Sequence, residues 1–154
     1  MNMSEADTAK PIELLAFKLG DHEYALDIMN VREIRGWTRA TPMPLAPSFM
    51  RGVINLRGTV LPVMDLAERL GLPKCGQSDR NVIIVIKHGE GMTGLLVGAV
   101  SDIVALNEED MQALPDAAPS DGSGVIRSLT LIEDRIIRVL DLTQILVRAE
   151  SDAA

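Results

Sequence analysis

Few side chains in this sequence could carry out metal or acid–base chemistry. The chain has two histidines, His22 and His88, and one cysteine, Cys75. A zinc site needs four ligands, so these three residues cannot complete one unless carboxylates join them. A single cysteine also rules out a disulfide within the chain. No Ser-His-Asp grouping is present either, so we expect no metal site and no enzyme activity.

Three glycines match the spacing of a dinucleotide-binding fingerprint, namely Gly89, Gly91 and Gly94. That fingerprint needs a helix directly afterwards, because the helix N-terminus holds the pyrophosphate. Residues 95–100 are small and aliphatic and lack helical polar spacing. The pattern therefore favours the turn of a β-hairpin over a nucleotide site.

Two acids with similar surroundings, Asp65 and Asp141, look like a catalytic pair. Each is followed three positions later by Glu68 or Gln144, the spacing of a helix capping box. We interpret both acids as N-caps of short helices over residues 65–70 and 141–147. A third short helix is expected over residues 108–114, where acids occupy the first turn.

Composition limits the class of protein and its partners. The 154 residues are 47% hydrophobic and carry a net charge of −7, which disfavours binding to nucleic acid. The longest aliphatic run is residues 82–86, far shorter than the ~20 residues that a membrane helix needs. The first ten residues contain no apolar segment typical of a secretory signal. We therefore expect a cytoplasmic protein that does not insert into a membrane.

Short aliphatic and β-branched segments between turn residues predict a chain made mainly of strands. The expected strands are residues 12–19, 22–26, 53–56, 59–63, 82–87, 95–100, 103–106, 125–132 and 135–140. Residues 1–11 and 149–154 are expected to be flexible tails. Residues 71–81 are expected to be a linker, and residues 116–124 a flexible loop.

The chain also repeats itself. Residues 17–34 align without gaps with residues 86–103, at a shift of 69. Residues 52–54 align with 124–126 at a shift of 72, and residues 63–66 with 139–142 at a shift of 76. Short loop insertions would produce such a growing shift. The pattern predicts two copies of one β-rich unit, over residues 12–70 and 82–148.

Two such units predict a pair of packed barrels with a cleft between them. Units of about 60–70 residues are marginally stable alone, so we expect them to pack as five-stranded barrels. Arg57, in a two-residue turn, stands out because we expect a longer hairpin at the equivalent place in the second copy. An acid recurs between aliphatic residues at Glu33 and Asp102. One account is an apolar groove with an acidic rim that receives a partner helix.

The ordered segments 17–35, 52–66 and 97–103 resemble the CheW-like domain family. The central segment contains Gly-Val-Ile-Asn-Leu-Arg-Gly at residues 52–58, and the resemblance spans about residues 12–148. It implies an all-β fold of two pseudo-repeated, five-stranded SH3-like barrels with a few short helices.

The resemblance also implies a function, that of a cytoplasmic adaptor without catalytic activity or cofactor. Such an adaptor joins the cytoplasmic tips of chemoreceptors to the regulatory domain of a CheA-type histidine kinase. The division of its contact residues between receptor and kinase stays open here. Carried onto matching positions, the resemblance predicts these protein-binding residues: Val31, Glu33, Ile34, Gly52, Arg57, Gly94, Val100 and Ile103.

Two alternatives remain. The first is a CheW-type adaptor of a non-flagellar chemosensory pathway, which the sequence does not distinguish from a flagellar one. The second is a small-molecule-binding barrel that uses the cleft between the two units. It would need a convergent set of polar side chains in a deep pocket, and the sequence shows none.

Overall fold

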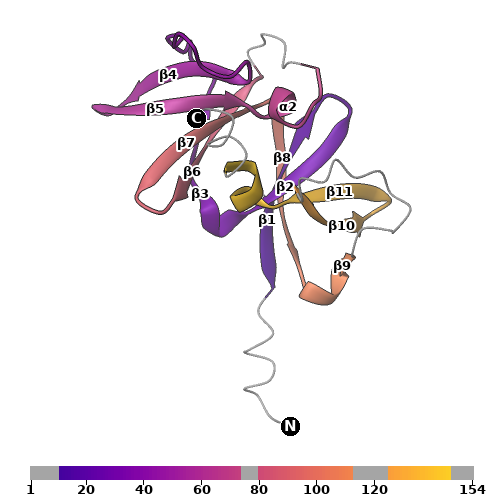
Figure 1. Cartoon of the computed structure of the whole chain (residues 1–154). Coiled ribbons are helices and arrows are strands. Elements are labelled where there is room, and N and C mark those ends of the chain that lie inside the picture. The colour runs from indigo at the N-terminus through magenta and orange to yellow at the C-terminus, as the bar shows by residue number, and fades with distance from the viewer. Residues whose placement is uncertain (1–10, 74–79, 113–124, 147–154) are drawn as a thin grey trace.

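The computed structural model describes residues 11–73, 80–112 and 125–146, which form two β-sheets with short helical turns (Figure 1). The expected all-β class is therefore confirmed. The expected tails, apart from Pro11, lie outside the described residues. So do the expected loop over residues 116–124 and residues 74–79 of the expected linker.

One sheet has six strands and the other has five. The six-stranded sheet has the order β8 (Ala99–Leu106), β1 (Ile12–Leu19), β2 (His22–Asp27), β11 (Arg135–Leu140), β10 (Ile126–Ile132) and β9 (Met111–Gln112). The five-stranded sheet has the order β3 (Val31–Gly36), β6 (Val82–His88), β7 (Gly91–Val97), β5 (Thr59–Asp65) and β4 (Met50–Leu56). The helical turns are η1 (Ile28–Asn30), α2 (Leu66–Arg69), η2 (Glu108–Asp110) and residues 142–146.

The prediction of a helix over residues 108–114 is wrong. Only η2 forms there, and the chain then enters β9. The Asp110 carboxylate accepts a hydrogen bond from the Asn107 amide at 2.9 Å, which favours a tight turn. Met111 then pairs with Thr130 of β10. The backbone at Met111 is therefore part of the sheet and cannot continue a helix.

The two expected helix caps are confirmed. The Asp65 carboxylate accepts a hydrogen bond from the Glu68 amide at 3.3 Å, and Asp141 accepts one from the Gln144 amide at 3.3 Å. Asp65 is fully buried and also forms an ion pair with Arg51 at 2.9 Å. These acids therefore have structural partners that explain them. The last residue of the expected helix over 141–147 lies outside the described part of the chain.

Each sheet combines strands from both copies of the repeat. The β1–β2 hairpin comes from the first copy and joins β8 to β11 of the second, whereas β6 and β7 of the second copy join β3 to β5 of the first. Two parallel pairs, β2 with β11 and β5 with β7, make the connection. Neither sheet is therefore built from the strands of one copy alone.

The register of the strands shows the duplication directly. In the parallel pairs, Ala25 lies opposite Val139 and Gly94 lies opposite Val63. These are equivalent positions at shifts of 69 and 76. Replacing every strand by its repeat equivalent turns the order β3-β6-β7-β5-β4 into β8-β1-β2-β11-β10. The two sheets are thus related by an internal pseudo-symmetry, and β9 is an addition to one of them.

The alignment of residues 52–54 with 124–126 is wrong by four positions. Gly52 lies opposite Val63, and Ser128 lies opposite Val139, so Gly52 and Ser128 are equivalent at a shift of 76. A β-bulge just before each of these two residues marks the same register. Residues 52–54 and 124–126 share the sequence Gly-Val-Ile, which suggested a shift of 72, but the strand pairing gives a shift of 76.

The hairpin turn of the second copy is not longer than that of the first, contrary to expectation. The β4–β5 turn is Arg57-Gly58, and the β10–β11 turn is Glu133-Asp134. All four residues have positive φ, at 50°, 87°, 47° and 68° in chain order. This is the two-residue turn whose twist matches that of the strands. Arg57 is therefore equivalent to Glu133, and the two turns differ in charge and not in length.

Hydrophobic side chains fill the space between the two sheets, where an open cleft was expected. Along β1, Leu15 and Phe17 face a central core shared by both sheets, whereas Leu14 and Ala16 face the interior of their own sheet. A separate cluster that includes Ile83 fills the five-stranded sheet. Strands buried on both faces read as continuous aliphatic runs, which explains residues 82–86.

In each sheet an arginine in or next to the hairpin turn forms an ion pair with an acid on an edge strand. In the five-stranded sheet, Arg57 lies 3.1 Å from Glu33. In the six-stranded sheet, Arg135 lies 3.3 Å from Asp102 and makes two hydrogen bonds to Glu23, at 2.7 and 2.8 Å. Glu33 and Asp102 are repeat equivalents, so the recurring acid has a structural role in both sheets.

The bidentate contact predicts a pH-dependent part of the stability. Hydrogen bonds from Arg135 lower the pKa of Glu23 below its usual value of 4.5. A carboxyl whose pKa is lowered on folding stabilises the protein at neutral pH and loses this contribution as pH falls through its folded pKa. Glu23→Gln should therefore reduce the free energy of unfolding by about 1 kcal/mol at pH 7.

Urea unfolding of both proteins at several pH values between 7 and 3 checks this. The difference between the wild-type protein and Glu23→Gln should shrink steadily below pH 4.5. A difference that stays constant or grows in acid would contradict the assigned role of the pair.

Candidate functional site

The exposed ion pair between Arg57 and Glu33 is the most prominent polar feature among the predicted protein-binding residues. The Asn55 side chain accepts a hydrogen bond from the Gly58 amide at 2.8 Å and so fixes the turn that carries Arg57. The Arg57 side chain is 68% exposed, whereas Glu33 on β3 is 27% exposed. Arg35 lies 3.8 Å from the same carboxylate. The Arg57 guanidinium is thus held in place by Glu33 and is open to a partner.

Two aliphatic residues, Val31 and Ile34, lie on the same strand as Glu33. Ile34 is 45% exposed, which is high for a large hydrophobic residue in a strand. Val31 is partly buried and packs against the central core. Val31, Glu33 and Ile34 thus lie on β3, and Glu33 binds Arg57. In the register with β6, Val31 and Ile34 lie on the central-core side of the strand, opposite Ile86 and Ile84, whereas Glu33 lies on the other side. We call Val31, Glu33, Ile34 and Arg57 the β3 surface.

The remaining predicted aliphatic residues lie on β8 of the other sheet. Ile103 is 56% exposed and is the repeat equivalent of Ile34. Val100 is partly buried against the central core, as Val31 is. Because β3 pairs with β6 and β8 pairs with β1, these residues form a second surface on a different sheet edge.

Gly52 is required by a close approach of two backbone segments. Thr41 exchanges backbone hydrogen bonds with Val53 at 2.8 and 2.9 Å, which draws the segment after β3 against β4. A Cβ on Gly52 would lie 2.0 Å from the Thr41 carbonyl oxygen, and the φ of Gly52 is 134°. Both facts exclude a larger residue without movement of the backbone. Gly52 thus acts through its backbone geometry.

Gly94 is also enclosed, but by side chains. A Cβ there would lie 2.9 Å from a methyl carbon of Ile83 and 3.4 Å from one of Val63. The equivalent residue in the other sheet is Ala25, which is fully buried. Neither Gly52 nor Gly94 offers a side chain to a partner, so both can affect binding only through the shape of the five-stranded sheet.

The chemistry available at these surfaces is that of binding. They combine exposed aliphatic side chains with a held guanidinium, a combination typical of protein interfaces. Among the described residues, no three potential metal-ligating side chains come together. In the same part of the chain, no helix is long and apolar enough to cross a membrane.

Sequence reasoning missed two features. The first is the cluster of Arg135 with Glu23 and Asp102, which also borders a shallow cavity beside Val100. Aligning the two hairpins at a shift of 76 would have placed Arg135 next to the turn equivalent to that of Arg57. The second is a cavity beside Trp37, which no sequence motif marks.

Comparisons with known proteins agree with this architecture. The family described as CheW-like domain matches residues 13–150. The chain is 46% identical over 142 residues to the chemotaxis protein CheW of Rhizobium meliloti, with 92% of each chain covered. It is 28% identical over 144 residues to protein FrzA of Myxococcus xanthus, covering 92% of this chain and 89% of the relative.

A solved structure shows the same fold. The crystal structure of the scaffolding protein TtCheW from Thermoanaerobacter tengcongensis superimposes with a TM-score of 0.78 at 30% identity, covering 85% of this chain and 89% of that chain. The expectation of two SH3-like barrels is thereby confirmed, with the sheets exchanging strands as described above. The sequence match over nearly all of the chain and the shared fold lead to one conclusion: this chain belongs to the CheW-like domain family.

Proposed function

We propose that this protein is a non-catalytic cytoplasmic adaptor that couples the tips of chemoreceptors to a CheA-type histidine kinase. The observation that supports this most is the family match over residues 13–150, together with relatives named as chemotaxis proteins. The scaffolding protein with the same fold supports a role in assembly. The exposed edges of β3 and β8 would provide the contacts.

The pseudo-symmetry supports a protein that binds more than one partner. Ile34 and Ile103 are equivalent and exposed, so each sheet offers an aliphatic edge of similar shape. The charged groups beside them differ, because Glu33 pairs with a turn arginine and Asp102 pairs with Arg135 in the following strand. Two edges of similar shape but different charge can select different partners.

In this proposal Arg57 is the anchor of the β3 surface. Its guanidinium is held by Glu33, so less side-chain entropy is lost when a partner binds. A carboxylate or carbonyl group of the partner would bind the exposed face of the guanidinium, while Ile34 packs against an apolar side chain. Arginine is enriched among the residues that dominate binding energy at such interfaces.

An adaptor of a non-flagellar chemosensory pathway remains the main alternative. The relatives include a protein with a different name, FrzA, so the family is not restricted to proteins called CheW. The alternative of a small-molecule-binding barrel needs a deep polar pocket between the two sheets, whereas the buried side chains of the central core in that region are hydrophobic.

Reversing the charge of Arg57 tests the proposal. Arg57→Glu should weaken assembly with a receptor cytoplasmic fragment and a CheA-type kinase by about 5- to 150-fold, because loss of an interface anchor costs about 1–3 kcal/mol. Co-sedimentation of the three proteins, with kinase autophosphorylation as a second readout, measures this effect. Unchanged assembly would remove Arg57 from the interface.

A charge swap separates binding from structural support. Glu33→Arg combined with Arg57→Glu restores an ion pair within the chain but places the wrong charge at the turn. If Arg57 contacts a partner, assembly stays weak in the double variant. If assembly recovers, Arg57 acts only by supporting Glu33. Thermal unfolding of each variant confirms that the fold is intact.

Gly52→Ala should disturb binding through the backbone. The new methyl group would overlap the Thr41 carbonyl, so we expect a loss of about 1–3 kcal/mol of stability and displacement of the segment after β3. Gly36→Ala is the matched control, because a Cβ at Gly36 meets no atom within 4 Å. Urea unfolding measures both variants, and equal stability of the two would contradict the assigned constraint.

A further inference from the structure

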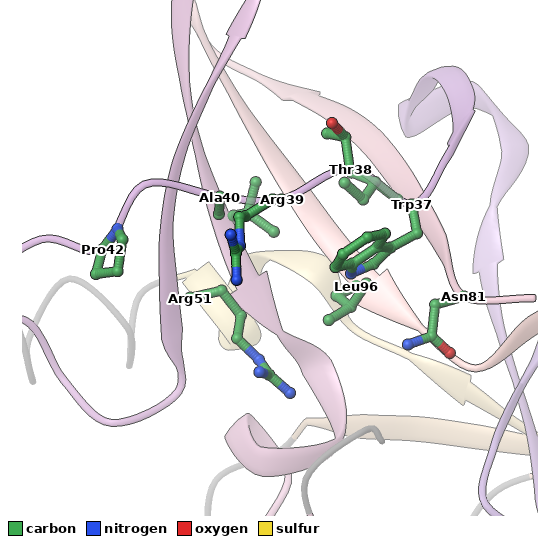
Figure 2. Close-up of a pocket in the computed structure, with 10 residues that line it drawn as sticks. Trp37, Thr38, Arg39, Ala40, Pro42, Arg51, Asn81 and Leu96 are labelled. Carbon is green, nitrogen blue, oxygen red and sulfur yellow. The ribbon is translucent and has the colours of Figure 1, made fainter. Parts of the chain in front are cut away.

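A cavity of about 180 Å³ opens at one end of the five-stranded sheet. Its floor is formed by the buried side chains of Val63, Ile83 and Leu96. Figure 2 shows the indole of Trp37 lying close to Leu96 at one side of the cavity. An apolar cavity of about 150 Å³ can bind benzene, so this one has room for a six-membered ring.

The rim of the cavity carries an excess of positive charge. Arg39 and Arg51 both line it, and Figure 2 shows them on neighbouring segments. The Asp65 carboxylate, which does not line the cavity, forms an ion pair with the Arg51 guanidinium at 2.9 Å. No acidic side chain is present among the described residues that line it. Arg39 is exposed, and its guanidinium therefore has no counter-charge among the described residues that line this cavity.

The equivalent cavity in the six-stranded sheet has a different charge. It is also lined by an arginine, Arg127, and by Leu14 and Val139, which are the equivalents of Ile83 and Val63. Its volume is about 240 Å³. Two carboxylates, Asp27 and Asp141, also line it. The repeat thus explains the position of the first cavity but not its positive charge.

We propose that the cavity beside Trp37 binds a small carboxylate whose apolar body is about the size of one ring. The ring would lie between the indole and the apolar floor, and the carboxylate would bind the guanidinium of Arg39. The site is independent of the proposed adaptor contacts.

Titration with benzoate tests this site directly. Trp37 is the only tryptophan of the chain, so its fluorescence reports on the cavity alone. We expect a saturable change in emission with a Kd on the order of 1 mM, as befits a ligand of this size. Methyl NMR should show shifts at Val63 and Ile83 and none at Leu14 and Val139. A non-saturating change, or equal shifts in both cavities, would overturn the proposal.

Matched variants and a neutral probe identify the source of the affinity. Arg39→Gln should weaken benzoate binding about tenfold. Arg32→Gln removes the same charge from an exposed position on β3 and should leave the affinity unchanged. Benzyl alcohol, which has the ring but no carboxylate, should bind more weakly than benzoate to the wild-type protein. Equal affinity of benzoate for the two variants, or of both probes for the wild-type protein, would show that no carboxylate site exists.

Discussion

The shared hydrophobic core between the two sheets is the constraint on which the rest of the structure depends. Strands of the β1–β2 and β6–β7 hairpins are buried on both faces, with one face toward their own sheet and the other toward the central core. The parallel pairs β2–β11 and β5–β7 link the two copies of the repeat within each sheet. Arg69 of α2 adds a hydrogen bond of 3.0 Å to the carbonyl of Ile145, its own equivalent in the second copy. Separating the two copies of the repeat would therefore break strand pairs in both sheets.

This construction determines where partners can bind. Because side chains of the central core occupy the space between the sheets, the proposed adaptor contacts lie at strand edges and hairpin turns. The edges of β3 and β8 repeat the same aliphatic pattern, while the turns that face them differ in charge. A rigid body with two similar but distinct edges suits an adaptor, since a displacement at one edge is transmitted to the other through a close-packed core.

The sequence predicts much of this architecture because repeat spacing and turn chemistry are local signals. The caps at Asp65 and Asp141 and the turn at Arg57 follow from short patterns. The exchange of strands between the copies does not, because the pairing of β2 with β11 joins residues more than a hundred positions apart. The helix expected from the acids at 108–110 failed because β10 supplies hydrogen bonds that local propensity cannot anticipate. Among the site residues, the contact of Glu33 with Arg57 depends on the same long-range pairing.

Native-state hydrogen exchange tests most directly whether the two sheets form one cooperative unit. If the central core and the exchanged strands bind both copies together, backbone amides in the β2–β11 pair and the β5–β7 pair should exchange with the same free energy, equal to that of global unfolding. Exchange of one pair at a free energy lower by about 2 kcal/mol or more, with the other still protected, would show two independent domains and contradict the account.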